Sequence, residues 1–407
     1  MRTRLFGAAL AASCLLLVLG CGSDDDGGGP NPVTGVDIAP DKAALEIGHS
    51  TGISATVTGG DNKNLTWFVN GVENGDEIYG TITQNSTVTY NAPDSLPSPR
   101  TVVIGAVSVE DTSKVDTCRV RVEFTKLFVD SATGNDDTAN GCINLPYRTI
   151  TRALPQATSG MTVLVRPGTY SDADGEFLPM HIYEGISLVG EDWEACIIKR
   201  APDASGSYGI LLSGNGAALR KFTIRQGGES RWRFPLLTDK EDGLIDSVRI
   251  FERGNTSCLR IDGAENVTVQ NCVFNVEQDI MDTARGRGFE FTSDDQGCII
   301  RNCRISGFGV ALFMNEDSDV LVEDCHLINN VFGAELCCDN GVSNPNPDFG
   351  GGARGSTGGN NIWGNSECGL ANYGGSTIYA KFNIWDNDPP IAGEDYCNES
   401  TGSIITE

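Results

Sequence analysis

The chain has 407 residues, of which 55 are acidic and 29 are lysine or arginine, so its formal net charge at pH 7 is −26. Such a charge opposes binding to nucleic acid, and it is compatible with neutral glycans, cationic partners or divalent cations. The 14 cysteines are compatible with an oxidising compartment outside the cytoplasm. Composition therefore favours an exported protein and argues against a nucleic-acid-binding one.

The first twenty residues have the pattern of an export signal. Arg2 and Arg4 precede an apolar run from Leu5 to Leu19, which is shorter than the roughly 20 residues of a membrane-spanning helix. The end of this run, residues 18–21, resembles the lipobox of bacterial lipoproteins, although Leu19 stands where a smaller residue is commoner. The resemblance implies that residues 1–20 are removed and that Cys21 carries the lipid. The alternative is an ordinary secretory signal cut near Gly20.

The segment that follows the cysteine is a predicted tether. Residues 21–32 are rich in Gly and Asp, and the stretch from 22 to 30 has no apolar side chain to pack against a core. This arrangement predicts that the lipid on Cys21 holds the protein on a membrane, and we therefore expect the protein in the cell envelope. Gly22, rather than Asp, after the cysteine favours the outer membrane or cell surface by resemblance to enteric lipoprotein sorting.

Residues 33–125 form the first predicted domain. Short β-branched runs at 52–58, 65–69, 101–107 and 119–122 alternate with Gly, Asn and Asp, which predicts a β-sandwich. The segments at 38–40, 66–71, 80–82 and 90–93 are similar to those of bacterial Ig-like domains. That resemblance implies a spacer or adhesion module without catalysis. Trp67 is then expected in the core between the two sheets.

Residues 126–407 contain an internal repeat. Five six-residue segments, at 219–224, 245–250, 269–274, 300–305 and 322–327, carry an apolar residue or Cys at positions one, four and six. Their starts are 26, 24, 31 and 22 residues apart. A looser series of apolar segments, at 258–261, 288–291, 310–314 and 334–337, lies between them. A repeat of this length predicts a parallel β-solenoid, since each coil buries its apolar face only by stacking on its neighbours.

The spacing inside each repeat predicts a sharp corner. The apolar–x–x–apolar step does not fit one flat strand, but it fits a strand, a corner and a second strand. Asn271, Asn302 and Asp324 would stand at that corner in three coils. The overall prediction is an all-β chain with an N-terminal sandwich followed by a parallel β-helix.

The start of the solenoid region carries a more specific resemblance. Residues 127–136, 146–154, 163–170 and 185–191 look like an uncharacterised family of pectin-lyase-like, right-handed parallel β-helices, classed as a domain of unknown function. The segments at 347–352, 358–362 and 383–386 are similar to the final coils of such proteins. The resemblance implies that residues 149–157 form a short helix that caps the open end of the solenoid.

The best predicted surface lies on the second strand series. Alternation places Phe289 and Phe291 inward and Glu290 outward, with Arg260 and Phe313 in the equivalent position on adjacent coils. The longest insertion between coils adds further charged residues, and long insertions often carry function. These neighbours are Asp282, Arg285, Arg287, Asp294 and Asp295. Glu290, Arg260, Asp294 and Asp295 are the catalytic candidates, and Phe313, Asp282, Arg285 and Arg287 the binding candidates; the alternative is a solvated, salt-bridged face.

The sequence is compatible with two functions. One is a non-catalytic binding or structural module that contacts glycan or protein. The other is a carbohydrate-active enzyme, either a polysaccharide lyase or a glycoside hydrolase, for which no complete catalytic motif is present. The three His residues show no metal-ligand spacing, so no metal site is predicted, although a carboxylate cluster of this kind is also suited to Ca²⁺.

The positions of the cysteines predict which of them are buried and which form disulfides. Cys272, Cys303 and Cys325 recur at one position of consecutive coils, which predicts an inward ladder of thiols with at most one disulfide among the three. Cys368 and Cys397 form a plausible disulfide near the C-terminal end. Cys118 and Cys142 flank the domain junction and are expected to link it. Vicinal Cys337 and Cys338 are expected to be buried or paired elsewhere rather than redox-active.

Overall fold

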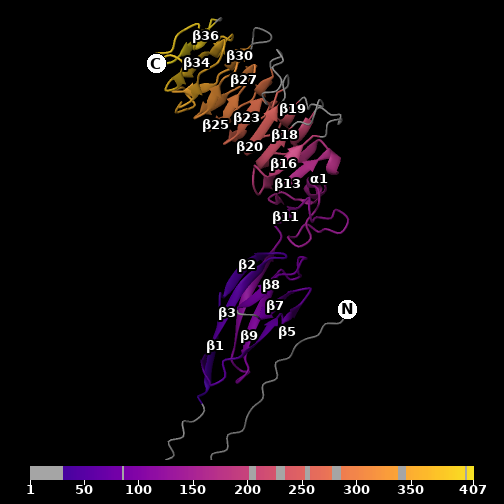
Figure 1. Cartoon of the computed structure of the whole chain (residues 1–407). Helices are drawn as coiled ribbons and strands as arrows, with labels where there is room; N and C mark the ends of the chain where they lie inside the picture. Colours follow the sequence, from indigo (N-terminus) through magenta and orange to yellow (C-terminus); the bar gives the residue numbers. More distant parts are fainter. Residues whose placement is uncertain are drawn as a thin grey trace, which may run out of the picture.

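The computed structural model describes residues 31–84, 87–200, 208–225, 234–252, 257–276, 286–337, 345–398 and 401–407. Cys21 and the predicted signal peptide lie outside these residues, as do Asp282, Arg285 and Cys338. Figure 1 shows two successive bodies, an N-terminal sandwich in indigo and purple and a longer solenoid from magenta to yellow. Within the described part of the chain, no helix is long and apolar enough to cross a membrane.

The sandwich consists of two five-stranded sheets, ordered β1-β3-β8-β7-β6 and β2-β10-β9-β4-β5. Alternate side chains of both sheets face each other, and Trp67, Tyr90, Ile104 and Val120 are buried there, as predicted for Trp67. The strands are β1 Val33–Ala39, β2 Lys42–Glu46, β3 Ser50–Gly59, β4 Leu65–Val69, β5 Val72–Glu73, β6 Gly75–Asp76, β7 Gly80–Gln84, β8 Val88–Asn91, β9 Thr101–Ser108 and β10 Val115–Glu123.

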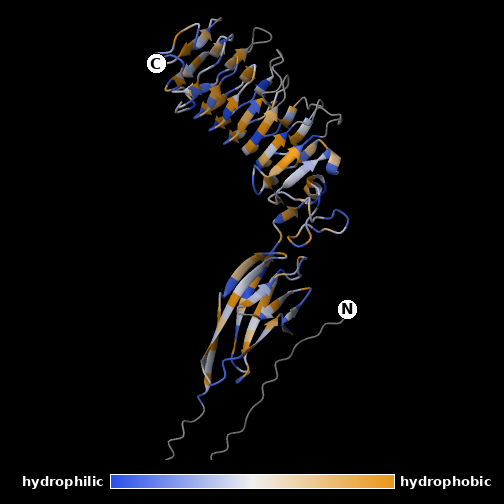
Figure 2. Ribbon diagram, viewed as in Figure 1, coloured by the Kyte–Doolittle hydropathy of each residue, from blue (hydrophilic) through white to orange (hydrophobic). Residues whose placement is uncertain are grey.

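The remaining chain forms a right-handed parallel β-helix, which confirms the predicted fold. One side of each coil belongs to a nine-stranded parallel sheet, ordered β14-β17-β19-β21-β24-β27-β30-β33-β36. Its strands are β14 Met180–Ile182, β17 Tyr208–Leu212, β19 Phe234–Thr238, β21 Leu259–Ile261, β24 Arg287–Phe291, β27 Val310–Asn315, β30 Phe332–Cys337, β33 Cys368–Asn372 and β36 Tyr396–Asn398. Figure 2 shows hydrophobic residues, in orange, on the strands of successive coils.

The other two sides of the coils form one 18-stranded sheet that turns a corner in each coil. We call its two halves the first band and the second band, in chain order within a coil. The long strands β18 and β20 contribute to both bands. The strands are β11 Lys126–Val129, β12 Thr162–Val165, β13 Gly168–Ser171, β15 Ser187–Gly190, β16 Cys196–Lys199, β18 Ala218–Arg225, β20 Leu244–Glu252, β22 Thr268–Gln270, β23 Val273–Val276, β25 Cys298–Arg301, β26 Arg304–Ser306, β28 Val320–Glu323, β29 His326–Ile328, β31 Asp348–Gly350, β32 Asn361–Ile362, β34 Thr377–Ala380, β35 Ile384–Trp385 and β37 Ser403–Ile405.

The predicted corner is present in every aligned repeat. Asn271, Asn302 and Asp324 have φ of 56°, 50° and 52°, and Lys221 and Ser247 hold the same place in β18 and β20 with φ of 59° and 57°. Asn and Asp tolerate this left-handed conformation better than most residues. The Asn302 amide also donates to Asn271 Oδ1 at 2.7 Å, so the corner side chains link neighbouring coils.

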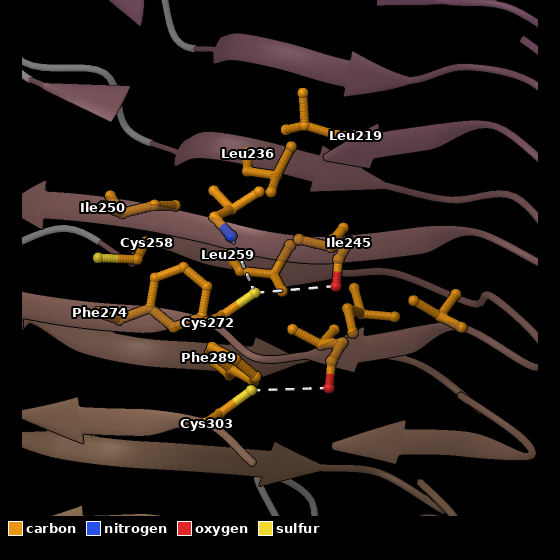
Figure 3. Close-up of a cluster of buried hydrophobic side chains, with 14 of the residues drawn as sticks. Leu219, Leu236, Ile245, Ile250, Cys258, Leu259, Cys272, Phe274, Phe289 and Cys303 are labelled. Carbon is orange, nitrogen blue, oxygen red and sulfur yellow. Dashed lines mark hydrogen bonds between the residues drawn. The ribbon is translucent and has the colours of Figure 1, made fainter. Parts of the chain in front are cut away.

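The cysteine ladder lies inside the solenoid, as predicted. Cys272, Cys303 and Cys325 are at most 1% exposed and all three are free thiols. Each Sγ donates to carbonyl oxygens, one of them in the preceding coil, such as Cys303 Sγ to Val269 O at 3.6 Å. Figure 3 shows Cys272 and Cys303 stacked beside Phe274 and Phe289. Burial raises the pKa of the Cys303 and Cys325 thiols, so these two act as small apolar residues rather than as nucleophiles.

The predicted disulfides have different outcomes. Cys368 and Cys397 are bonded, joining β33 to β36 at the C-terminal end. The expected link between Cys118 and Cys142 is wrong, because both are free thiols. Instead, both side chains are completely buried in the sandwich core, which Cys142 enters from the loop after β11. Side-chain packing, and not a covalent bond, therefore connects the solenoid to the sandwich at this point.

Hydrogen bonds reinforce this junction. Asp94 of the sandwich accepts two of them. The side-chain amide of Asn140 donates to the Asp94 backbone carbonyl at 2.6 Å, and that of Asn144 donates to Asp94 Oδ1 at 2.7 Å. The rings of His49 and Phe128 lie 5.7 Å apart across the same boundary. These contacts, together with the buried Cys142, hold the first coil against the end of the sandwich.

A short helix covers the first coil, as predicted for residues 149–157. Helix α1 spans Ile150–Ala153 and continues as the 3₁₀ helix η1, Leu154–Gln156; a second 3₁₀ turn, η2, spans Asp172–Asp174. Ile150, Ala153 and Leu154 are buried in the solenoid core. The buried Glu176 carboxylate accepts from the backbone of Ile150 at 2.7 Å and of Thr151 at 2.9 Å. The helix thus closes the apolar end of the stack, and a carboxylate fixes its first turn.

Candidate functional site

The predicted surface residues stand side by side on the outer face of the nine-stranded sheet. Arg260 of β21 is in register with Glu290 of β24, which is in register with Phe313 of β27. Glu335 of β30 continues the row. Phe289 and Phe291 point inward and are completely buried. The alternation of each strand and the stacking of the coils therefore bring Arg260, Glu290 and Phe313 together as the sequence indicates.

Glu290 is held by two neighbours. Arg287 Nη1 lies 2.9 Å from Glu290 Oε1, and Ser257 Oγ donates to Glu290 Oε2 at 2.5 Å. The side chain of Glu290 is only 14% exposed. A carboxylate fixed on both oxygens is positioned for recognition of a ligand, because its orientation costs little further entropy on binding.

Phe313 lies beneath Arg287. The guanidinium carbon of Arg287 is 3.3 Å from the centroid of the Phe313 ring, and Phe313 is 4% exposed. This stacking is a cation–π contact, and it turns the aromatic face away from solvent. Phe313 therefore supports Arg287 in this structure, whereas its place in the strand pattern predicts a ring that faces the ligand directly.

Arg260 is oriented by a second set of contacts. Its Nη2 donates to Asp262 Oδ2 at 3.1 Å, and its guanidinium carbon lies 5.1 Å from the ring centroid of Phe234. The Nε of Arg260 has no hydrogen-bond partner among the described residues. The side chain is 24% exposed, so part of the guanidinium reaches the surface.

Asp262 completes the group. It accepts from the hydroxyls of Thr292 at 3.0 Å and Ser293 at 2.8 Å, as well as from Arg260. Burial alone would raise its pKa, but the hydrogen bonds from Ser293 and Thr292 and the charge of Arg260 lower it. Asp262 is thus an anion at neutral pH and is poorly suited to act as a general acid.

The adjacent residues Asp294 and Asp295 have different environments. Asp294 is exposed, whereas Asp295 is completely buried and accepts from the backbone N–H of Ala264 at 2.9 Å. Burial raises the pKa of Asp295 to about 6. Because the Asp295 carboxyl faces the interior of a turn rather than the surface, we assign it a structural role. Asp282 and Arg285 lie outside the described residues.

We call Ser257, Arg260, Asp262, Arg287 and Glu290 the Arg–Glu cluster. Sequence reasoning missed Ser257, Asp262 and the supporting Phe234. The residue in register with Arg260 on β19 is Leu237, and Ser257 and Asp262 flank β21, so strand register does not mark any of the three. The cluster offers two guanidiniums and two carboxylates, a set suited to hydrogen-bonding hydroxyl groups. Within the described residues, no group of three or more His, Cys, Asp or Glu side chains is arranged to hold a metal ion.

A separate cavity lies at the N-terminal cap, away from the cluster. Its volume is about 210 Å³, smaller than the several hundred Å³ typical of sites for drug-sized ligands. Several of its polar groups already have partners: Glu176 holds helix α1, and Tyr170 donates to Arg166 O at 2.9 Å. The cavity therefore serves the cap and does not compete with the Arg–Glu cluster as the main candidate site.

Several solved structures are similar to this chain. A rhamnogalacturonan lyase is 14% identical with a TM-score of 0.49, over 65% of this chain and 73% of the other. Pectin methylesterase PemA from Erwinia chrysanthemi is 12% identical with a TM-score of 0.41, over 67% and 92%. GH136 lacto-N-biosidase from Eubacterium ramulus is 10% identical with a TM-score of 0.38, over 69% and 68%. Identities this low carry no statement of activity.

The comparison with curated proteins finds no match. A family match, by contrast, covers residues 132–392, which include most of the solenoid and all of the Arg–Glu cluster. The matched residues include the capping helix α1 and the strands from β12 to β35. The chain therefore belongs to the family described as Protein of unknown function (DUF1565).

Proposed function

We propose that this protein is a lipid-anchored component of the bacterial cell envelope that binds glycan without turning it over. In this proposal Cys21 carries the lipid, residues 21–32 are a tether, and the sandwich is an Ig-like spacer. The β-helix presents the Arg–Glu cluster to the ligand. The observation that carries the proposal is the Arg260–Glu290 register, which fixes charged hydrogen-bonding groups on a rigid, solvent-facing sheet.

The charged groups of the cluster are held in place but not fully used. The side chains of Arg260 and of its carboxylate partner Asp262 are 24% and 36% exposed, so both present polar atoms to solvent. Sugar hydroxyls both donate and accept, so they match adjacent guanidinium and carboxylate groups. A glycan is therefore the ligand class that best fits this mixture of charges.

The protonation states favour binding over glycoside hydrolysis. A glycosidase needs one carboxylic acid with a raised pKa beside the scissile bond. In the cluster, the pKa of Asp262 is lowered and Glu290 is paired with Arg287. The carboxyl with a raised pKa, Asp295, is completely buried.

The test of glycan binding is a glycan array probed with the full chain, with and without Ca²⁺. On any glycan that binds, Arg260→Ala should weaken affinity by about 10-fold or more, since a hydrogen bond to a charged group contributes roughly 1.5–3 kcal/mol. Arg121→Ala, a change of the same kind on the sandwich, where the side chain is 67% exposed, should have no effect.

The same glycans are then assayed for unsaturated uronates and new reducing ends. No product is expected. Product formation that Glu290→Gln abolishes would overturn the proposal and establish the alternative, a polysaccharide lyase or glycoside hydrolase. Equal affinity of wild type and Arg260→Ala would show that the cluster is not the binding site.

Anchoring has a test of its own. Cys21→Ser should release the protein from the membrane fraction into the soluble fraction, because two or more acyl chains hold a protein on a bilayer stably and none would remain. Cys14→Ser is the matched control, because Cys14 lies in the segment that is removed, and this variant should stay in the membrane fraction. Retention of Cys21→Ser in membranes would contradict lipidation at that residue.

A further inference from the structure

One side of the sandwich carries a cleft of about 520 Å³, within the range of roughly 300–1,000 Å³ that is usual for ligand pockets. The cleft lies between β3 of one sheet and the start of β4 of the other, beside the ends of β7 and β8. Its floor is apolar and consists of Ile53, Leu65, Trp67 and Val88. Leu65 and Val88 are only partly buried, so the core is incompletely covered at this point.

β3 lacks a neighbouring strand along the cleft. On one side, β1 pairs with β3 from Ser54 to Gly59. On the other side, β8 pairs with β3 only from Ser50 to Ile53. In the described part of the sandwich, the second half of β3 is therefore a sheet edge, and such an edge is a template for another strand.

The backbone groups of Ala55 and Val57 point toward this open side. In an antiparallel pair, opposite residues alternate between exchanging both backbone hydrogen bonds and exchanging none. Ile38 donates its N–H to Asp116 of the other sheet at 2.8 Å, so Ile38 and its partner Ala55 exchange none. Val57, two residues further on, follows the same alternation. No backbone hydrogen bond from another described residue reaches Ala55 or Val57 on the open side.

β4 contributes a second free edge to the same cleft. The carbonyl oxygen of Trp67 accepts from the N–H of Asn74 at 3.0 Å, so it points away from the neighbouring strand β9. Leu65, two residues earlier, points in the same direction. β5 pairs only with Phe68 and Val69 and does not extend to Leu65. Unpaired backbone from both sheets thus borders the cleft, as it would where one strand is missing.

Lys63 gives the mouth of the cleft a positive charge. It is the only charged side chain that lines the cleft in the part of the chain that the structure describes. Its ammonium group donates to Gly59 O, which is neutral, and it forms no ion pair with a carboxylate of any described residue. A cation beside an apolar floor favours a ligand that combines apolar side chains with a carboxylate.

We infer that this cleft binds an extended segment of a partner protein by strand addition to β3. The segment pairs with the backbone of Ala55 and Val57, and every second side chain, if apolar, fills the floor above Trp67. An acidic residue of the segment meets Lys63. The sandwich is then a docking module for a protein as well as a spacer.

Two other occupants fit less well. The tether of this chain, residues 22–30, supplies three Asp but no apolar side chain for the floor. A glycan has no row of N–H and C=O groups at the spacing of a peptide backbone, so it cannot pair with the edge of β3. The cleft is on the sandwich, and the Arg–Glu cluster is on the β-helix, so the inference does not depend on the proposed glycan site.

The test measures the binding of a fluorescein-labelled peptide, Glu-Val-Thr-Val-Thr-Val-Glu, to the full chain by fluorescence anisotropy. Glu at both ends allows either strand direction. Val57→Pro should weaken binding by about 10-fold or more, because proline removes the N–H that faces the ligand strand. Proline is tolerated at a sheet edge where the N–H faces outward, so the sandwich should still fold.

The matched control is Val36→Pro on the outer edge of the same sheet. Val36 is opposite Val57, so by the same alternation its N–H points away from β3, and this variant should keep wild-type affinity. Val57→Ala, which keeps the N–H, should change the affinity less than 3-fold. Lys63→Ala should weaken binding by about 2- to 5-fold, the range for an exposed ion pair, and should not affect a peptide with Gln in place of Glu.

A second measurement uses only the wild-type chain, in case Val57→Pro unfolds the sandwich in a thermal unfolding check. Two peptides carry N-methyl groups on alternate residues, one on each set. Strand addition predicts that one of them binds at least 10-fold more weakly than the other, because only one set of N–H groups faces β3. Equal affinity of the two N-methylated peptides would overturn the inference, as would equal losses in Val57→Pro and Val36→Pro.

The remaining outcomes concern the occupant. Dimerisation of the full chain that Val57→Pro abolishes, in sedimentation velocity, would show that a second copy fills the cleft. Peptide affinity that rises at least 10-fold when residues 22–30 are deleted would show that the tether fills it. Either result would overturn the assignment to a partner protein. Arg260→Ala should leave peptide binding unchanged, so failure of the glycan site and failure of this cleft are distinguishable.

Discussion

Phe289→Ala is expected to lower the free energy of unfolding by about 3–5 kcal/mol, the range for large-to-small substitutions of buried aromatic residues. Phe289 is completely buried on β24, and its ring meets that of Phe274 edge-on at a centroid distance of 4.7 Å. Figure 3 shows both rings beside the cysteine ladder. Loss of the ring leaves a cavity between coils, and the surrounding strands are hydrogen-bonded on both sides and cannot collapse into it.

The measurement is urea unfolding followed by far-UV circular dichroism. Phe382→Ala is the control, because Phe382 lies in the last coils and is 71% exposed, and it should change the free energy by less than about 0.5 kcal/mol. Similar effects of the two substitutions would contradict the placement of Phe289 in the core. Because solenoids gain stability from neighbouring coils, the loss at Phe289 should also spread to hydrogen exchange in β21 and β27.

Asp295→Asn is expected to stabilise the protein at neutral pH by roughly 3 kcal/mol. Burial raises the folded-state pKa of Asp295 from 3.8 to about 6, and each pKa unit corresponds to about 1.4 kcal/mol. The folded state therefore binds this proton more tightly than the unfolded state. The stability that comes from the proton is complete below about pH 4 and is lost as the pH rises through about 6.

Asparagine keeps an oxygen to accept from Ala264 N–H and carries no charge to bury. The free energy of unfolding of Asp295→Asn should therefore equal that of the wild type near pH 4, exceed it increasingly between pH 4 and 6, and show the full difference above pH 7. Thermal unfolding at pH 4.0, 5.0, 6.0 and 7.5 measures this difference. Asp294→Asn, at the exposed neighbour, is the control and should show no such trend; a pH-independent effect of Asp295→Asn would contradict the burial of an ionisable carboxyl.

The sequence determined the architecture because a solenoid repeats one local pattern. Residues at the same place in successive coils stack on each other, so the recurrence of Cys272, Cys303 and Cys325 is enough to identify an interior row. Spacing alone also locates the corner, where Asn271 and Asn302 adopt positive φ. The alternation around Glu290 likewise places Arg260 and Phe313 beside it.

Tertiary structure alone decided how these side chains are used. Arg287 covers Phe313, Asp295 turns inward while Asp294 stays exposed, and Cys142 enters the core of the sandwich. None of these follows from a repeat, because each depends on the conformation of a loop or of a long side chain.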